Sequence, residues 1–396
     1  MPRSLPIALA IALLSWAPSA AQQDQRRSHQ APRDPSILEA EPVPEIARGS
    51  SFIDVVFVLD STGSMSGLIE GAKQKIWSIA NAIATAEPRP QIRMGLVSYR
   101  DRKDAYITRI SKLTDDLDYF YSDLMQVEAG GGGDTPESVN QALHEAVTRI
   151  TWSDDRSTLR LLYLVGDAPP HMDYDEVQYP ESARLAAERD IFINTIQCGK
   201  MGGTREVWRE ISSLARGQYF AIDQSGGVRS IESPFDGELA RLSRESDGTF
   251  LPYGSESEIV AQKEKQRVAR EIDEAASQSA LAERAVFKNS SAGKASFGGG
   301  KEFLQDVESG GVDLGTLEEA ELPDALQAVP EAEREQWIAD QIARRRGLRE
   351  EIVWLNDKRM KWLAANNPDG DDGFDHKVLE ALRRQASTKG IRYTSE

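Results

Sequence analysis

The sequence predicts an α/β fold with a doubly wound, mostly parallel six-stranded sheet, one antiparallel edge strand and an α-helical C-terminal region. From Phe52 onward, short apolar runs bounded by turn residues alternate with amphipathic stretches, which is typical of a parallel sheet covered by helices on both faces. After Ser230 no further convincing strand run occurs, and long stretches rich in Ala, Glu and Arg follow. With 396 residues, 40% of them apolar, the chain is long enough for two to three domains and at least one sizeable core.

The first 50 residues predict a signal peptide and a linker. Arg3 precedes an apolar run from Leu5 to Trp16, and small residues end the segment at 21, as at a cleavage site. Residues 22–50 are polar and contain proline, so we expect a disordered linker. No run approaches the roughly 20 apolar residues that a membrane-spanning helix needs. We therefore expect an exported protein, periplasmic or extracellular, without a transmembrane segment; an uncleaved anchor is the alternative.

Six apolar runs predict the strands. One of them follows the preceding run after only a few residues, so we expect it to be the antiparallel edge strand of a hairpin. The predicted strands are Phe52 to Leu59, Ile92 to Tyr99, Tyr106 to Ile110, Leu159 to Val165, Ile191 to Gln197 and Gln218 to Ile222.

Apolar residues at helical spacing predict the helices that cover this sheet. One stripe runs from Leu68 to Ile83 and another from Val139 to Ile150. Together, residues 51–230 are predicted to form the α/β domain.

Residues 231–396 are predicted to form a helical C-terminal region. Ser255 to Phe287 and Pro330 to Ala364 are candidates for long helices, and a flexible Gly/Ser loop is expected at 289–300. We expect this region to pack on the α/β domain or to extend from it. A partly disordered acidic tail is the alternative.

Charge and cysteine content exclude several classes of function. The chain has 47 Lys and Arg against 64 Asp and Glu, a net charge of −17, which repels nucleic acid and anionic membranes. A single cysteine, Cys198, rules out an intrachain disulfide framework and a cysteine-built zinc site. The four histidines form no HxxxH or HExxH pair.

Oxygen-bearing side chains follow two of the predicted strands. Asp60 ends the first strand, and Thr62 and Ser64 follow at alternate positions. Thr135 comes after the glycine run 130–133, and Asp167 ends another apolar strand. Because ligands bind at the carboxyl ends of parallel strands, we expect these five side chains to meet. Carboxylate and hydroxyl oxygens without imidazole or thiolate suit Mg²⁺, Mn²⁺ or Ca²⁺ better than zinc.

Each of these residues also has a purely structural interpretation. Ser64 or Ser66 can cap the first helix, Thr135 before Pro136 can cap the next one, and Asp167 can be a turn residue. Their occurrence together favours the metal site.

With this pattern the chain resembles the von Willebrand factor type A domain and its metal-ion-dependent adhesion site. The family pattern is Asp-x-Ser-x-Ser, a distant Thr and a distant Asp, and Thr62 keeps the hydroxyl where Ser is more usual. The matching residues are Asp60, Thr62, Ser64, Thr135 and Asp167.

The resemblance covers about residues 51–230 and implies a Rossmann-like sheet with one divalent cation, for which we expect Mg²⁺ with Mn²⁺ or Ca²⁺ as alternatives. It also implies binding to another protein that presents a Glu or Asp side chain to the ion. Ser66, Asp134, His171 and Asp173 are candidates for the rim that contacts this partner. A wider similarity is to exported bacterial proteins with such a domain and a helical C-terminal region; it runs through Thr249 to Gly254, Glu321 to Asp324 and Glu335 to Leu363.

Two other functions remain open at this point. Asp60 and the residues after it also resemble the aspartyl-nucleophile motif of haloacid-dehalogenase-type phosphotransferases. However, no lysine lies between Lys112 and Lys200 to stabilise a transferring phosphoryl group, so we expect no enzyme activity. The third interpretation is a scaffold that binds its partner through the C-terminal helices.

Overall fold

Six strands form one sheet in the described part of the chain, which comprises residues 52–133, 135–224, 231–296, 301–366 and 374–393 of the computed structural model. All of these belong to one unit, Pro42–Glu396. The predicted signal peptide at 1–21, the predicted linker at 22–50, Asp134 and part of the predicted Gly/Ser loop (297–300) lie outside the described residues.

The strand order is β3-β2-β1-β4-β5-β6, and all neighbouring pairs are parallel except β2 and β3. The predicted sheet and its antiparallel edge strand are confirmed. The edge strand runs over Thr108–Thr114 and not from Tyr106 to Ile110, because its half-exposed polar end carries no apolar signal. The strands are β1 (Phe52–Asp60), β2 (Gln91–Tyr99), β3 (Thr108–Thr114), β4 (Leu159–Gly166), β5 (Ile191–Cys198) and β6 (Tyr219–Ile222).

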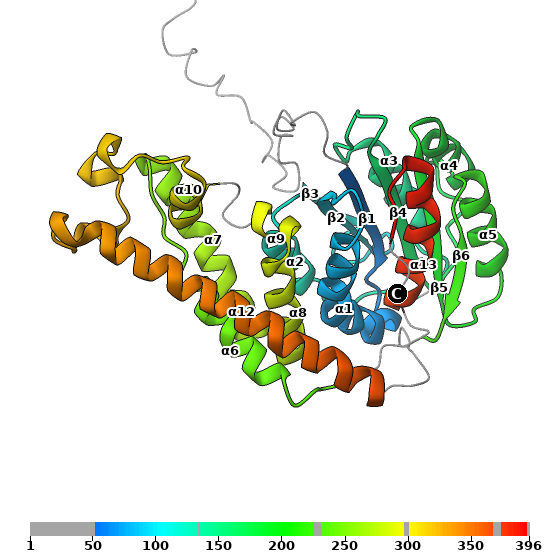
Figure 1. Cartoon of the computed structure of the whole chain (residues 1–396). Helices are drawn as coiled ribbons and strands as arrows, with labels where there is room; N and C mark the ends of the chain where they lie inside the picture. The colour runs from blue at the N-terminus through cyan, green and yellow to red at the C-terminus, as the bar shows by residue number, and fades with distance from the viewer. Residues whose placement is uncertain (1–51, 134, 225–230, 297–300, 367–373, 394–396) are drawn as a thin grey trace, which may run out of the picture. The chain divides into compact units, whose positions relative to one another are not determined.

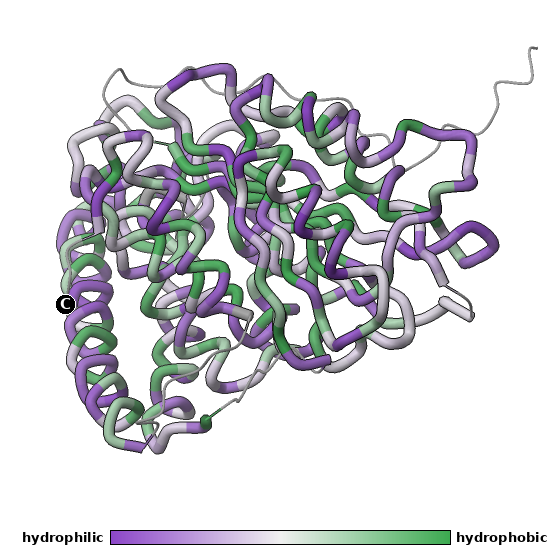
Figure 2. Tube along the Cα trace, turned by 90° about the vertical axis from the view of Figure 1, so that its right-hand side faces the viewer, coloured by the Kyte–Doolittle hydropathy of each residue, from purple (hydrophilic) through white to green (hydrophobic). Residues whose placement is uncertain are grey.

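Helices cover both faces of the sheet. Successive residues of β1 point to opposite faces, so Val55 and Phe57 pack with α1, α2 and α13, whereas Val56 and Val58 pack with α3, α4 and α5. In Figure 2 the hydrophobic residues gather along the strands and on the helix sides that face them. The helices are α1 (Ser66–Ala84), α2 (Leu117–Met125), α3 (Val139–Thr148), α4 (Tyr179–Glu188), α5 (Thr204–Leu214) and α13 (Phe374–Ala386).

The last helix, α13, returns to the sheet after the intervening helical region. It lies beside α1 (Figure 1), and its Val378 and Leu382 are buried in the same core as β4. The Tyr163 hydroxyl donates to the Val378 carbonyl at 2.8 Å. Asn194 of β5 and Gln385 exchange side-chain amide hydrogen bonds of 2.9 and 2.8 Å. The sequence pattern had not assigned this segment to a face of the sheet.

The helical C-terminal region consists of several helices, in agreement with the prediction. The predicted helix from Ser255 to Phe287 is wrong in one respect: it breaks at Ala276, which is extended, and Ser277 caps a new helix by accepting from the Ala280 N–H. Part of the predicted 289–300 loop is helical. The helices are α6 (Asp236–Asp247), α7 (Glu256–Ala275), α8 (Gln278–Asn289), α9 (Ser291–Ser296), α10 (Phe303–Ser309), α11 (Asp324–Gln327) and α12 (Arg334–Asn366).

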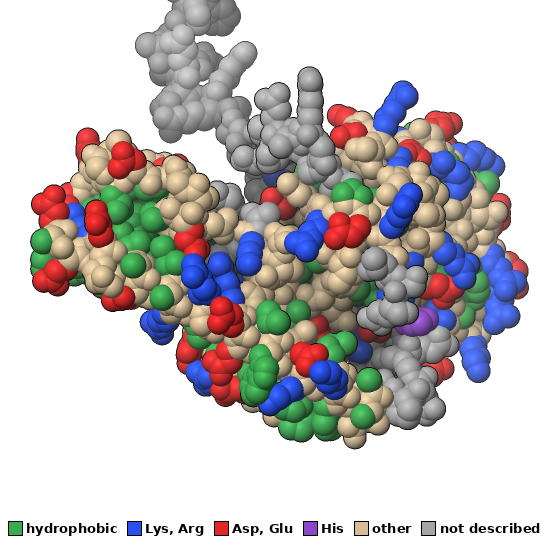
Figure 3. All heavy atoms as spheres, viewed as in Figure 1, with side chains coloured by type: hydrophobic (Ala, Val, Ile, Leu, Met, Phe, Trp, Pro, Cys, Tyr) green, Lys and Arg blue, Asp and Glu red, His purple; other side chains and the backbone are tan. Residues whose placement is uncertain are grey.

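Acidic and basic side chains are interspersed over the face seen in Figure 3. Within the described ranges, none of the helices has the length and apolar character required to cross a membrane.

Candidate metal centre

The candidate site lies at the carboxyl ends of β1 and β4, where the strand order reverses. The chain proceeds from β1 to β2 and β3 on one side and from β4 to β5 and β6 on the other, so the loops after β1 and β4 diverge. Asp60 is the last residue of β1, and Asp167 directly follows β4. Leu59 pairs with Val165 in parallel register, which brings both acidic residues to the same edge of the sheet.

Asp60 is fully buried, and its two carboxylate oxygens have different surroundings. Oδ1 accepts hydrogen bonds from the backbone N–H and the hydroxyl of Thr62, at 2.8 and 2.7 Å. Oγ1 of Thr62 lies 3.3 Å from Oγ of Ser64. Oδ2 is buried and has no hydrogen-bond partner among the described residues. The three residues of the predicted motif therefore converge and leave one buried carboxylate oxygen unused.

Gly166 allows β4 to approach Asp60 closely. A Cβ atom on Gly166 would lie 2.5 Å from the Tyr99 hydroxyl and 3.1 Å from Oδ2 of Asp60, so no larger residue fits. The next residue, Asp167, is buried, and its Oδ2 accepts a hydrogen bond of 2.7 Å from Nε2 of Gln224. This arrangement holds the second predicted carboxylate at the same crevice.

The glycine loop packs against the Asp60 motif. Gly131 and Gly132 have φ values of +71° and +66°, which favour glycine. The carbonyl of Gly131 accepts a hydrogen bond of 3.2 Å from the N–H of Gly63, and a Cβ atom on Gly132 would lie 3.1 Å from Cβ of Thr62.

Thr135 is exposed and joined to Pro136 by a cis peptide bond. Among the described residues its side chain makes no hydrogen bond, so its role as a ligand stays a prediction.

Burial perturbs three groups that face one another here. It raises the pKa of Asp60 to about 7; the two hydrogen bonds from Thr62 oppose this shift and the charge of Asp167 adds to it. Burial, together with the charges of Asp60, two other aspartates and Asp167, raises the pKa of Glu137 to about 9. The pKa of the Tyr99 hydroxyl is raised well above its usual value, by burial first and then by Asp60 and Glu137. The crevice therefore disfavours added negative charge and favours a cation.

The sequence of this region matches the family model of the von Willebrand factor A domain over residues 54–232. These residues form a von Willebrand factor A domain. The chain is also 29% identical over 128 residues to the alpha-protein kinase vwkA of Dictyostelium discoideum, a match covering 31% of this chain and 20% of that protein. It spans a fifth or less of the known relatives it matches.

Two solved structures are similar to this von Willebrand factor A domain. The SpRpn10 VWA domain has 15% identity and a TM-score of 0.34, with coverage of 44% of this chain and 88% of that one. Proximal thread matrix protein 1 from the mussel byssus, with a zinc-occupied MIDAS motif, has 14% identity and a TM-score of 0.35, with coverage of 43% and 42%.

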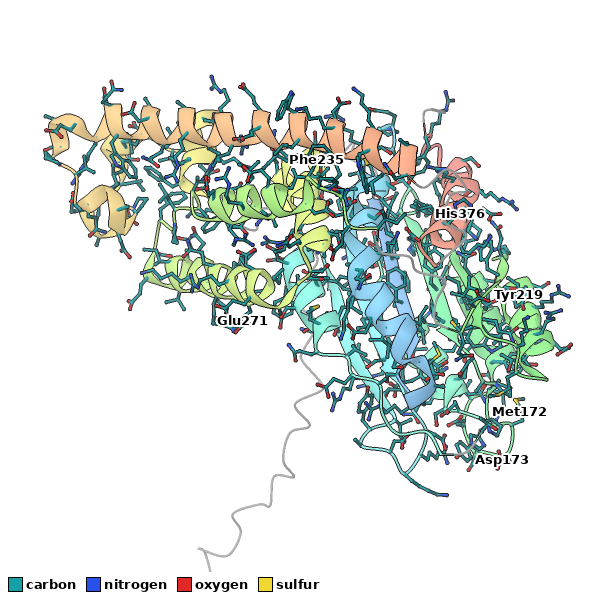
Figure 4. All side chains as sticks on the ribbon, turned by 90° about the horizontal axis from the view of Figure 1, so that it is seen from below. Met172, Asp173, Tyr219, Phe235, Glu271 and His376 are labelled. Atoms are coloured by element: carbon teal, nitrogen blue, oxygen red, sulfur yellow. The ribbon has the colours of Figure 1, made fainter. Side chains whose placement is uncertain are left out.

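The candidate rim residues of the domain lie in different surroundings. Ser66 begins α1 and is exposed. His171 is largely buried; its Nδ1 lies 2.8 Å from Oδ1 of Asp173, and its ring stacks on Tyr174. Met172 and Asp173, on the loop after β4, are exposed (Figure 4). Asp134 lies outside the described residues.

The residues present fit a hard divalent cation. Oδ2 of Asp60 is a buried oxygen without a partner, and the hydroxyls of Thr62 and Ser64 lie beside the same carboxylate. Oxygen donors of this kind suit Mg²⁺, Mn²⁺ or Ca²⁺. In the described ranges, no three His, Cys, Asp or Glu side chains are grouped to hold a metal. The fit consequently depends on hydroxyl ligands, as the family resemblance implies.

The structure adds three residues that the sequence analysis did not select. Tyr99 ends β2 with its hydroxyl against Gly166, Gln224 donates to Asp167, and Glu137 is buried beside the glycine loop. A Glu two residues after Thr135 was visible in the sequence, but its burial was not. The position of Gln224 depends on a long-range contact that no local pattern encodes.

Proposed function

We propose that this chain is a metal-dependent protein-binding module that holds one divalent cation at the crevice between β1 and β4. The expected ligands are Asp60, Thr62, Ser64, Thr135 and Asp167. A bound cation would supply the positive charge to which a partner's Glu or Asp side chain binds. Mg²⁺ is the expected ion, with Mn²⁺ or Ca²⁺ as alternatives.

The observation that carries this proposal is the unpartnered Oδ2 of Asp60. Leaving a buried carboxylate oxygen without a partner is costly, and the other oxygen already accepts two hydrogen bonds from Thr62. Asp60 and Thr62 hold this oxygen at the domain's crevice, where the neighbouring hydroxyls can complete an oxygen-donor set.

The test is capture of a binding partner from native extract by the full-length protein, with Mg²⁺ and again with a chelator. Asp60→Asn serves as the matched variant because it keeps the shape of the side chain and removes its charge. We expect a partner that is retained by the wild-type protein with Mg²⁺ and released by chelator. Equal retention of that partner by Asp60→Asn would contradict the proposal.

We also propose that the protein is not an enzyme. The experiment that tests this is an assay with generic phosphate esters, because Asp60 is the candidate nucleophile of the phosphotransferase alternative. Hydrolysis by the wild type that Asp60→Asn abolishes would favour that alternative.

The scaffold alternative makes a different prediction. If the C-terminal helices alone bind the partner, Asp60→Asn leaves partner binding unchanged, whereas substitutions on the exposed side of α12 abolish it. Trp354 is such a position, since 55% of its surface is exposed.

We further propose that the protein is exported from a bacterial cell, because residues 1–21 have the pattern of a signal peptide. N-terminal sequencing of the mature protein is the direct test, and we expect it to begin near Gln22.

A further inference from the structure

Gln224 contacts two segments of the candidate metal centre. Its Nε2 donates a hydrogen bond of 2.7 Å to Oδ2 of Asp167 and one of 3.3 Å to the backbone carbonyl of Ser64. Both acceptors are oxygens, so only the NH₂ end of the amide can face them. Asp167 directly follows β4, and Ser64 follows β1. One side chain therefore joins the segment after β1 to the segment after β4.

This side chain comes from the far side of β5. In the sheet, β5 lies between β4 and β6, and Gln224 follows the end of β6 at Ile222. The N–H of Gly199, directly after β5, donates to the Ile222 carbonyl at 3.0 Å. The Gln224 side chain therefore extends past the carboxyl end of β5 to reach Asp167.

Gly199 provides the space for this side chain. A Cβ atom on Gly199 would overlap Oε1 of Gln224. The φ value of Gly199 is +71°, which also favours glycine. Oε1 of Gln224 is therefore next to Gly199 while Nε2 contacts the two segments of the centre.

The main chain of Asp167 is held by a different residue. The buried hydroxyl of Thr204, the first residue of α5, donates to the Asp167 carbonyl at 3.0 Å. In the described part of the chain, Gln224 is the residue whose side chain donates to the Asp167 carboxylate. The direction of this carboxylate therefore depends on Gln224, whereas the path of the backbone does not.

We propose that Gln224 is a positioning residue of the metal centre, which orients Asp167 and fixes the segments after β1 and β4 to each other without serving as a ligand. This inference rests on the proposed function. Gln224 is neutral, so it acts through geometry and not through charge. Groups that hold a metal's direct ligands commonly change metal affinity by about 10- to 100-fold.

The test is calorimetric titration of the full chain with Mg²⁺, and with Mn²⁺ and Ca²⁺ as the alternative ions, together with melting temperatures with and without the ion. Gln224→Met keeps the length of the side chain and removes its hydrogen-bond donors. Gly199→Ala disturbs the same hydrogen bonds from the other side, because the added methyl group displaces Oε1. Gln91→Met is the matched control, since Gln91 is exposed at the start of β2, at the opposite edge of the sheet.

We expect Gln224→Met to weaken binding of the ion that the wild type prefers by about tenfold or more. The rise in melting temperature on adding that ion should shrink accordingly. Gly199→Ala should also weaken binding, but the double variant should bind no more weakly than Gln224→Met alone, because the amide is then already gone. Gln91→Met should bind the ion as the wild type does.

A merely structural Gln224 would lower the melting temperature equally with and without the ion and leave the dissociation constant unchanged. An unchanged dissociation constant in Gln224→Met would overturn this inference alone. Tighter binding by Gln224→Met would also overturn it, because the amide would then compete with the ion. Failure of the wild-type chain to bind any of the three ions would overturn the proposed function, and this inference with it.

Discussion

At the scale of single residues, the burial of Asp60 should make the metal-free protein less stable at neutral pH. Its carboxyl group is fully buried, and burial raises its pKa to about 7. An unfolded chain returns this pKa to about 3.8. Folding therefore takes up a proton between these values, and the metal-free protein becomes less stable as pH rises from about 4 to about 7.

The variant Asp60→Asn should show how much the buried charge of Asp60 lowers stability. Above pH 7 without metal, we expect the variant to be more stable than the wild type by up to about 4 kcal/mol, because the buried charge is gone. The gain should shrink as pH falls and disappear below about pH 4, where both side chains are neutral. Urea unfolding in chelator at pH 8 and at pH 4 measures this gain in the free energy of unfolding. A variant less stable than the wild type at pH 8 would contradict the prediction.

Cation binding should also depend on pH. A proton competes with the cation for Asp60 below pH 7, so the Mg²⁺ association constant should fall at least about tenfold from pH 8 to pH 6. Titration of the wild type at the two pH values gives this ratio. An affinity that does not change with pH would show that Asp60 is already ionised without metal.

The residues of the Asp60 motif could be predicted because they are local. Asp60, Thr62 and Ser64 lie within five residues at the end of one apolar run, and the structure brings them together. Burial of Glu137 and the hydrogen bond from Gln224 to Asp167 depend on contacts between distant segments. Such contacts leave no periodic signal in the sequence.

At the scale of secondary-structure elements, the sequence predicted strands better than helix ends. Five strands of the predicted sheet match within one residue at each end, because apolar runs in a parallel sheet are bounded by turns. The break between α7 and α8 at Ala276 was missed, since Ala favours helix and only Ser277 signals the new start. The position of α13 was not predictable, because an amphipathic stripe does not specify the surface that it covers.

The packing of α13 on the sheet should contribute substantially to stability. Leu382 is buried in the main core, so Leu382→Ala should cost about 2–5 kcal/mol in the free energy of unfolding. Arg384→Ala on the same helix, an exposed ion pair with Glu380, should cost less than about 1 kcal/mol. Equal urea midpoints for the two variants would contradict the placement of α13.

A buried arginine joins the von Willebrand factor A domain to the helical region. Arg284 of α8 is completely buried and donates to both oxygens of Asp118 of α2, at 2.6 Å each, and to Asp247 of α6 at 2.6 Å. Burial alone would raise the pKa of Asp118, but Arg284 and Lys288 outweigh it and hold that pKa well below its usual value. This cluster fixes α2 against α6 and α8.

Removing the guanidinium of Arg284 should therefore lower the stability of the protein. Arg284→Met leaves the buried carboxylates of Asp118 and Asp247 with Lys288 as their remaining cation, and we expect a loss of about 3–5 kcal/mol at pH 7. The loss should be smaller at pH 4, where the carboxylates of the variant can take up protons. Arg241→Met is the control, because Arg241 pairs with exposed acids on α6 and should change stability by less than about 1 kcal/mol. Chemical unfolding that cannot distinguish the two variants would contradict the role of Arg284.

At the scale of the whole molecule, a von Willebrand factor A domain is followed by a set of helices, the last of which returns to its sheet. The chain leaves the sheet after β6, forms α6 to α12, and returns as α13 to cover the sheet beside α1. The candidate metal centre lies at the carboxyl edge of this sheet, and α13 packs on one face of the sheet. The acidic composition gives the chain a net charge of −17, so under the proposed function an acidic partner would bind only with the help of the cation.

The measurement that tests the central claim most directly is calorimetric titration of the full-length protein with Mg²⁺, Mn²⁺ and Ca²⁺, in parallel with Asp60→Asn. We predict that the wild type binds one ion per chain and melts at a higher temperature when it is present, whereas Asp60→Asn does neither. If the wild-type protein released no heat with any of the three ions and kept the same melting temperature, there would be no metal centre between β1 and β4.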